Sequence, residues 1–571
     1  MGWSENVMAQ GVLGFFQACV WLVWNVGLYW QRRLWHWLTE KSDKRLLIET
    51  LNASRQFEEW HAAALELDRL LGNDVWRASQ ADYPNNYYNY ELIAQRTYVL
   101  EEAIANGDIM QIHDLLRSGL ERNPGGILNP KLYSKANAGT KILIEDYYTL
   151  VVEAIRIFTI WPSNLVEQGV VERGPTPQMK MDLLHDARMS YGRTVLVLQG
   201  GSIFGLCHLG VVKAMYERGL LPRIIAGTAT GAIMAAWVGV HTETELLDCL
   251  KGERINLGAF AASSERAAAK SNVSSGWIWL QTFHRRVRRF LQSGFILDPD
   301  VLEETVRANV GEMTFGEAYN RTQRILNITI SPSGPGAITL LNYLTAPHIL
   351  IWSAALVSNA ADRSKTRIRL MCKDSEGRIV PYENFPATKR PYRSTPATPK
   401  ESPLSRLGEL FNVEHFIISQ ARPYIAPFLY PSLRRSRTSV FAVFARFMLW
   451  EFQHRLRQLD ILGLLSPGIK RLLLDEIVPG PALTLVPEIR LADWARLLRN
   501  PTGAEVDHWI ERGERSVWPN AAQLEVRLSV EQELEKSYQL VRRGPVDSEE
   551  RARGKGPKRR KTRAASAGKS L

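Results

Sequence analysis

Two nearby stretches decide the fold: Thr194-Val195-Leu196-Val197-Leu198-Gln199-Gly200-Gly201-Ser202-Ile203-Phe204-Gly205 and Arg223-Ile224-Ile225-Ala226-Gly227-Thr228-Ala229-Thr230-Gly231. Each begins with a short, continuous apolar run, which is typical of a strand buried in a parallel sheet. A glycine-rich turn follows each run, and the pattern predicts a helix after each turn, over 206–218 and 232–239. Further strands are predicted over 325–330 and 415–418. Strands that alternate with helices predict right-handed crossovers and a mostly parallel sheet covered on both faces.

Both turns have the composition of sites that bind negative charge. A glycine-rich turn between a strand and a helix directs backbone N–H groups towards one point, together with the N-terminus of the helix. The first turn contains Gly200, Gly201, Ser202 and Gly205, and it matches neither the dinucleotide pattern nor the P-loop. The second, from Gly227 to Gly231, has the layout of a nucleophile elbow, which presents its middle side chain above the sheet. Together the turns predict an oxyanion hole that faces a nucleophile position.

Longer stretches identify a family. They include Tyr87-Tyr88-Asn89-Tyr90, Gly139-Thr140-Lys141, Gly205-Leu206-Cys207-His208-Leu209-Gly210, Leu220-Leu221-Pro222, Leu341-Asn342-Tyr343-Leu344-Thr345-Ala346-Pro347 and Gly513-Glu514-Arg515-Ser516. Over roughly residues 70–540 the chain resembles the patatin-like lipid acyl hydrolases, specifically the storage-lipid triacylglycerol lipases of fungi and plants. The resemblance implies an α/β fold: a three-layer α/β/α core with a mostly parallel sheet, flanked by helical N- and C-terminal regions. It also implies a Ser–Asp dyad, in which the elbow serine attacks an ester carbonyl and the aspartate of an Asp-Gly turn acts as its base.

Both members of the implied dyad are replaced. The nucleophile position is Ala229, whose methyl group has no lone pair and cannot attack a carbonyl. Counting along the chain places Thr395 where the aspartate should be, and no Asp-Gly pair occurs anywhere in the sequence. The first turn also has Ser202 where the family usually has a third glycine. Loss of both dyad members predicts a natural pseudoenzyme, because a laboratory Ser→Ala trap would leave the aspartate turn intact. In a serine hydrolase, loss of the nucleophile lowers kcat by about 10⁶.

Three hydroxyls near the expected site keep a second interpretation open, a residually active lipid hydrolase that uses an unrecognised residue. They belong to Ser202, Thr228 and Thr230, but no base is recognisable beside any of them. The two threonines flank the apex of the elbow and should point into the fold. His208 follows the first turn without an identifiable acid partner, so we expect it to be structural.

The sequence predicts five regions. They are a hydrophobic membrane or lipid-droplet anchor (1–45), a helical domain (46–190), the patatin-like core (191–423), a helical C-terminal region (424–545) and a disordered basic tail (546–571). The helical domain shows apolar periodicity over 46–71, 98–104, 109–120 and 140–159. In the C-terminal region the pattern predicts helices over 441–474 and 529–540.

The run from Gly11 to Trp30 has no charged residue and is long enough to span a bilayer as a helix. It predicts an uncleaved anchor, and the lysines and arginines between Arg32 and Arg45 place the following chain on the cytosolic side. A segment lying in a phospholipid monolayer and a buried core helix remain alternatives. We therefore expect a membrane-associated protein at lipid droplets, the endoplasmic reticulum or both. Its expected partners are neutral lipid or phospholipid, and active paralogous lipases.

Charge distribution and cysteine spacing argue against several other classes of protein. The 571 residues carry a net charge of +12, but residues 551–571 hold nine Lys and Arg and no acid. The tail thus accounts for +9 and leaves +3 for the other 550 residues, which argues against broad nucleic-acid binding. A nucleic-acid or nuclear-import role for the tail is a less favoured alternative. The four cysteines (Cys19, Cys207, Cys249 and Cys372) lie far apart without metal-ligand spacing, so we expect no zinc module, disulfide scaffold or cofactor.

Overall fold

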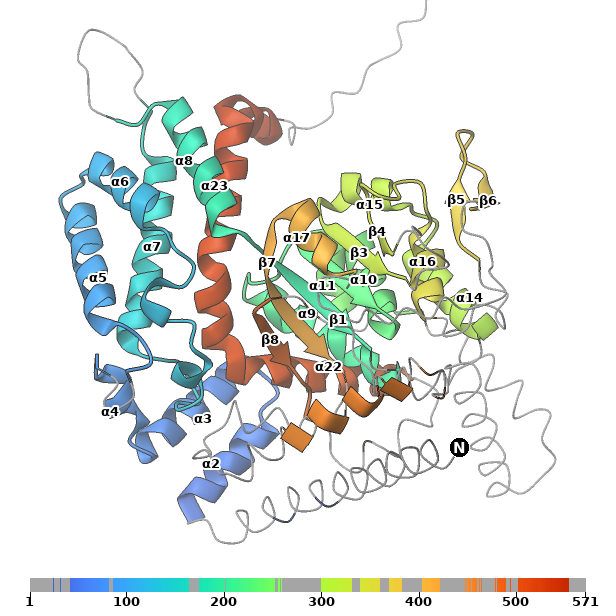
Figure 1. Cartoon of the computed structure of the whole chain (residues 1–571), viewed down its shortest axis with the longest axis horizontal. Helices are drawn as coiled ribbons and strands as arrows, with labels where there is room; N and C mark the ends of the chain where they lie inside the picture. Colours follow the sequence, from blue (N-terminus) through green and yellow to red (C-terminus); the bar gives the residue numbers. More distant parts are fainter. Residues whose placement is uncertain are drawn as a thin grey trace, which may run out of the picture.

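The computed structural model describes residues 42–81, 86–163, 174–200, 202–251, 299–330, 339–359, 369–382, 403–421, 481–488 and 502–553, with scattered residues between these ranges. Within them an N-terminal group of helices lies on one side of a long C-terminal helix, and a covered β-sheet lies on the other (Figure 1). The described part therefore has a helical layer and an α/β core joined along one helix.

The core is a six-stranded sheet in the order β4-β3-β2-β1-β7-β8. Its strands are β1 (Arg193–Gln199), β2 (Ile224–Thr228), β3 (Ile325–Thr329), β4 (Leu340–Leu341), β7 (Val413–Gln420) and β8 (Ala482–Leu485). All neighbouring pairs are parallel except β3 with β4. The predicted α/β class and the mostly parallel sheet are confirmed, and each of the four predicted strands is present.

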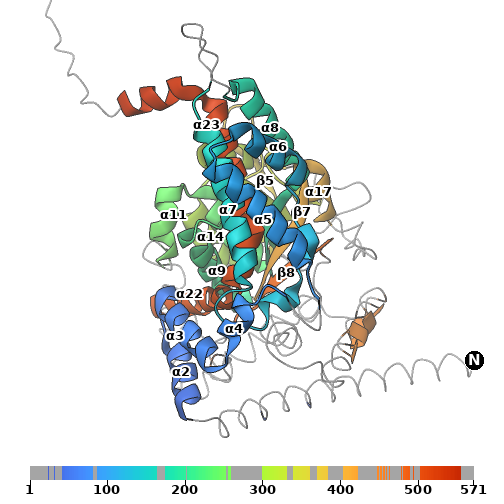
Figure 2. The ribbon, with the colours of Figure 1, turned by 90° about the vertical axis from the view of Figure 1, so that its left-hand side faces the viewer.

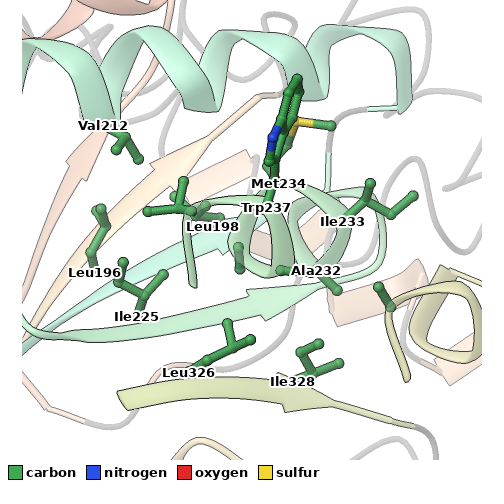
Figure 3. Packing of buried hydrophobic residues seen from close by; sticks show 14 of the residues in the cluster. Leu196, Leu198, Val212, Ile225, Ala232, Ile233, Met234, Trp237, Leu326 and Ile328 are labelled. Carbon is green, nitrogen blue, oxygen red and sulfur yellow. The ribbon is translucent and has the colours of Figure 1, made fainter. Parts of the chain in front are cut away.

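Both faces of the sheet are buried, which explains the uninterrupted apolar runs. Along β1, Leu196 and Leu198 belong to one hydrophobic cluster, while Val195 and Val197 belong to a second cluster on the other face. The helices against the first face include α9 (Cys207–Glu217), α10 (Thr230–Val240) and α16 (Ile351–Asn359). Figure 3 shows α10 lying over the sheet in this cluster. Helix α17 (Ser405–Phe411) packs on the second face.

The N-terminal helices form their own core. They are α2 (Ser42–Ala53), α3 (Phe57–Leu70), α4 (Asn73–Ala78), α5 (Tyr90–Ala105), α6 (Ile109–Gly119), α7 (Ile142–Ile160) and α8 (Pro177–Tyr191). Helices α5 to α8 lie beside α23 (Ala521–Arg553) in Figure 2. They enclose a hydrophobic cluster that α23 completes with Val526, Val530 and Leu534. The C-terminal helix is therefore shared between the helical layer and the α/β core.

Ion pairs reinforce this shared helix. Glu531 of α23 pairs with Arg122 of the helical layer, and Glu535 pairs with Arg188 of α8 and Arg223 at the start of β2. The Arg122 and Glu531 side chains are both largely buried. Breaking a buried pair by removing one partner destabilises a fold by about 3–5 kcal/mol, because the remaining charge has no compensation. The pair therefore holds α23 to the helical layer.

Several elements differ from the predictions in extent. The apolar-periodic stretch 46–71 is two helices, α2 and α3, because the chain leaves the helix after Ala53 and re-enters it at Phe57. Strand β8 was not predicted, and α23 extends well beyond 529–540 in both directions. The remaining described helices are α11 (Glu243–Leu250), α14 (Pro299–Val310), α15 (Phe315–Thr322) and α22 (Gly503–Val517), beside a small hairpin of β5 (Met371–Lys373) and β6 (Ile379–Pro381).

Some predictions fall on residues that the structure does not describe. These are the anchor from Gly11 to Trp30 apart from Trp24, most of 441–474, and the tail beyond Arg553. Among the described residues, no helix combines the length and the apolar character that crossing a bilayer requires.

Candidate active site

The two glycine-rich turns leave the sheet side by side. Strands β1 and β2 are parallel neighbours, and Gln199 pairs in register with Thr228. Gly200 follows the first of these residues and Ala229 follows the second, so both turns begin at the carboxyl-terminal edge of the same strand pair. Ligand sites of open α/β sheets lie at this edge.

Ala229 has the backbone conformation of a nucleophile elbow. Its φ is +52° and its ψ is −122°, outside the regions that an alanine readily adopts. A residue in such a region is strained by about 1–3 kcal/mol and persists only where the surrounding structure holds it. Helix α10 begins immediately afterwards at Thr230. The strained turn of an elbow is thus present, with a methyl group at its apex.

Two glycines allow this turn to pack against the sheet. A Cβ added to Gly231 would lie 2.1 Å from the carbonyl oxygen of Leu198 on β1. A Cβ added to Gly227 would lie 2.5 Å from the Cα of Ala232. No side chain fits at either position without moving backbone, which explains why the elbow requires glycine at both.

The first turn contacts the elbow directly. A Cβ at Gly205 would lie 2.7 Å from the Cγ2 of Thr230, the first residue of α10. Gly200 has a φ of +63°. Ser202 begins a short 3₁₀ helix (Ser202–Leu206), and Gly201 lies outside the described residues. The first turn thus contacts the elbow through Gly205, and the oxyanion hole assigned to Gly200, Gly201, Ser202 and Gly205 stays a prediction.

Helix α16 supplies two contacts that sequence reasoning did not find. The backbone N–H of Ala229 donates to the Ser358 hydroxyl at 3.0 Å, and the Thr230 hydroxyl donates to Asn359 Oδ1 at 3.4 Å. Both residues lie at the C-terminal end of α16, and 129 residues separate each from its partner. They hold the strained elbow in place, and Ser358 brings a hydroxyl next to its apex.

His208 is structural, as its missing acid partner suggested. Its side chain is fully buried on α9, with Nδ1 2.7 Å from the Ser419 hydroxyl and Nε2 3.4 Å from the carbonyl oxygen of Gly200. A carbonyl can only accept, so Nε2 carries the proton and Nδ1 accepts from Ser419. Burial lowers the pKa of His208 to about 4. The neutral ring therefore ties the first turn to β7.

The remaining candidate residues are not assembled into a catalytic group. Thr228 is buried at the end of β2. Among the described residues, neither its hydroxyl nor that of Thr230 lies within hydrogen-bond distance of a histidine, aspartate or glutamate. Thr395, the position assigned to the aspartate, is outside the described ranges. Within the described ranges, no three His, Cys, Asp or Glu side chains lie together so that they could hold a metal ion.

The first turn is supported from behind by α22. Phe204 packs edge-on against Trp509, with ring centroids 5.3 Å apart, in a small cluster that includes Cys207. Helices α9 and α22 touch backbone to backbone, because a Cβ at Gly210 would lie 1.9 Å from the carbonyl oxygen of Ile510. The turn thus rests on a tightly packed pair of helices.

Comparisons with known proteins agree with this geometry. Residues 196–361 match the model of the patatin-like phospholipase family, and residues 37–185 match a domain of unknown function, DUF3336. The chain is 34% identical to triacylglycerol lipase ptl1 of Schizosaccharomyces pombe, over 84% of this chain and 82% of that protein. It is 31% identical to triacylglycerol lipase SDP1L of Arabidopsis thaliana and 30% identical to triacylglycerol lipase 4 of Saccharomyces cerevisiae. These two alignments cover 86% and 88% of this chain, but 58% and 54% of the respective relatives.

A solved structure also matches in part. The type III effector protein ExoU is 15% identical with a TM-score of 0.23, over 61% of this chain and 53% of that chain. The family assignment rests on the family model and on the relative that matches over most of both lengths. The chain belongs to the patatin-like phospholipase family, within a group whose relatives include triacylglycerol lipases of fungi and plants.

Proposed function

We propose that this protein binds neutral lipid or fatty acyl chains at the elbow site without hydrolysing them efficiently, and that it regulates or assists active relatives in neutral-lipid metabolism. The observation that carries the proposal is Ala229, a methyl group at the apex of an otherwise complete elbow. A pseudoenzyme of this kind keeps the family's site for a ligand and lacks its nucleophile.

The geometry suits an ester carbonyl. We assign the stabilisation of negative charge on a carbonyl oxygen to backbone N–H groups of the turn after β1 and to the N-terminus of α10. The glycines at 227 and 231 and the Ser358 contact hold the strained turn at Ala229, although no side chain at its apex can attack. Binding through such donors needs no nucleophile, whereas acyl transfer does.

The test measures binding and hydrolysis together. Purified full-length protein is mixed with a trioleoylglycerol emulsion and with a fluorescent triacylglycerol ether, which cannot be hydrolysed. We expect saturable binding of the ether, competition by trioleoylglycerol and fatty-acid release at the level of protein-free emulsion. Ala229→Leu fills the site and should weaken ether binding, whereas Ala62→Leu, at an exposed position of α3, should not. Equal binding by native protein and both variants would refute a ligand site at the elbow.

One observation favours a second candidate, residual hydrolysis through Ser358. Its hydroxyl lies 3.0 Å from the Ala229 nitrogen and is partly accessible. A fluorophosphonate probe separates the two candidates. Labelling that disappears in Ser358→Ala and persists in Ser202→Ala would support hydrolysis by Ser358, and absence of labelling would exclude a serine mechanism.

We also propose that the protein acts at lipid droplets or the endoplasmic reticulum, with its body on the cytosolic side. The uncharged run from Gly11 to Trp30 supports an anchor, and the nine cations of 551–571 suit anionic headgroups. Near a membrane each such cation contributes about 1 kcal/mol. Deletion of 551–571 should therefore reduce membrane retention at raised salt. Unchanged retention would remove the electrostatic part of this proposal and favour another role for the tail.

A further inference from the structure

A small polar cavity lies at the amino-terminal edge of the sheet, away from the edge that carries the elbow. The starts of β1, β2 and β3 enclose it together with α8, the end of α15 and α23. Its volume is about 170 Å³. It is therefore located where the helical layer, the shared C-terminal helix and the sheet meet.

Arginines dominate the charged lining of this cavity. The charged residues are Arg188, Arg193, Arg223, Arg542, Glu531 and Glu535. Glu535 is shared by two arginines, Arg188 at 3.1 Å and Arg223 at 2.5 Å. Arg193 and Arg542 have no acidic side chain within ion-pair distance in the described part of the chain.

The second glutamate is also engaged. Glu531 pairs with Arg122, which is not part of the lining, and accepts from the backbone N–H of Thr194 at 2.8 Å. The negative charge of Glu531 therefore compensates Arg122 rather than an arginine of the cavity lining. Neither carboxylate is left to balance Arg193.

Two buried arginines outside the lining, Arg122 and Arg527, add positive charge near the cavity. Arg527 lies one helical turn before Glu531 on α23 and is only 7% exposed. Its Nε and Nη1 have no hydrogen-bond partner among the described residues, and the same holds for Nε and Nη1 of Arg122. The effect is visible at His415 on β7, whose pKa is lowered to about 3 by burial and by these two arginines. In the lining itself four arginines face two glutamates, an excess of two positive charges, and the buried Arg122 and Arg527 lie outside that lining.

We propose that this cavity is a binding site for a small phosphate-bearing anion. The planar guanidinium group matches phosphate oxygens with paired N–H donors. Arg223 and Arg542 are exposed and Arg193 is half-buried, so an anion can reach them, and the buried charge of Arg122 and Arg527 outside the lining favours a compensating anion nearby. At about 30 Å³ per water molecule the cavity has room for roughly five waters, which suits phosphate or a small phosphomonoester. It is smaller than the roughly 300–1,000 Å³ of sites for drug-sized ligands.

The site is separate from the elbow and independent of the proposed function. A bound phosphate group would contact Arg193 of β1, Arg188 of α8 and Arg542 of α23, which belong to three different parts of the fold. Its binding would therefore tighten the junction between the helical layer and the core. Two sources share this chemistry, a free phosphomonoester and the headgroup of a phospholipid such as phosphatidic acid.

Calorimetric titration of the purified full-length protein tests the site. Sodium phosphate and glycerol 3-phosphate are titrated at constant ionic strength, set with sodium chloride. We expect saturable binding that weakens at least tenfold in Arg193→Gln and also weakens in Arg542→Gln. The matched control is Arg378→Gln, an exposed arginine in the turn between β5 and β6, which should bind as the native protein does.

A vesicle arm distinguishes the two sources. Phosphatidylcholine vesicles with and without phosphatidic acid are sedimented with each variant. If retention depends on phosphatidic acid and falls in both cavity variants but not in Arg378→Gln, the ligand of the cavity is a lipid headgroup. Titratable phosphate binding without that dependence assigns a free phosphomonoester. Absence of saturable phosphate binding to the native protein, or equal binding by Arg193→Gln and Arg542→Gln, would show that the arginines serve only as ion-pair partners.

Discussion

Replacing Ala229 by glycine should stabilise the elbow, although glycine usually destabilises a folded chain. At φ +52° and ψ −122° a Cβ is strained by about 1–3 kcal/mol, and glycine removes that strain. Against this, glycine has greater backbone freedom in the unfolded state, which lowers stability by about 0.4–1 kcal/mol. The net change in the free energy of local unfolding is therefore a gain of about 1 kcal/mol. The matched control is Ala62→Gly, at an exposed position inside α3, where glycine should cost about 1 kcal/mol.

Hydrogen exchange followed by mass spectrometry measures both changes locally. A change of 1 kcal/mol alters the population of the open state about fivefold. Amides of β2 and α10 should therefore exchange about fivefold more slowly in Ala229→Gly, and amides of α3 about fivefold faster in Ala62→Gly. If β2 and α10 exchanged faster in Ala229→Gly, the turn would not be strained and the elbow geometry would be wrong.

Two further predictions follow from buried groups. Folded His208 stays neutral down to about pH 4, whereas the unfolded residue takes up a proton below pH 6.5, so acidification from pH 7 to pH 5 should remove about 2 kcal/mol of stability. Urea unfolding at both pH values should show that His208→Gln, which does not titrate, loses about 2 kcal/mol less over this interval, and an equal loss would contradict a buried neutral ring. Arg122→Met should lower the unfolding free energy by about 3 kcal/mol, because Glu531 remains without its cation. The double variant Arg122→Met/Glu531→Met should lose less than Arg122→Met alone, and a purely additive loss in urea unfolding would show that the two residues are not coupled.

The strands around the site could be predicted from sequence because they are buried on both faces. Leu196 and Val197 point to opposite faces, and each meets a hydrophobic cluster, so no polar residue interrupts the run. Strand β8, over 482–485, lies at the edge of the sheet and pairs with β7 from more than 60 residues away. A short run with such a distant partner carries too little periodicity to be recognised.

The elbow could be predicted from sequence because its local geometry requires glycines at fixed positions. The contacts that hold the elbow could not be predicted in this way. Ser358 reaches the nitrogen of Ala229 across 129 residues, and nothing in the local pattern of α16 indicates this contact. The arginine cavity is a stronger case, because its lining comes from three strands and three helices. Only the folded chain brings Arg193 and Arg542 together.

The most direct test of the central claim is the rate at which purified full-length protein releases fatty acid from a trioleoylglycerol emulsion. The comparison is an active triacylglycerol lipase of the same family, assayed at equal concentration. Because Ala229 has no nucleophile, we predict a rate lower by about 10⁶, indistinguishable from protein-free emulsion. Release at a rate within tenfold of the active lipase would contradict the account, because it would require a nucleophile that Ala229 cannot provide.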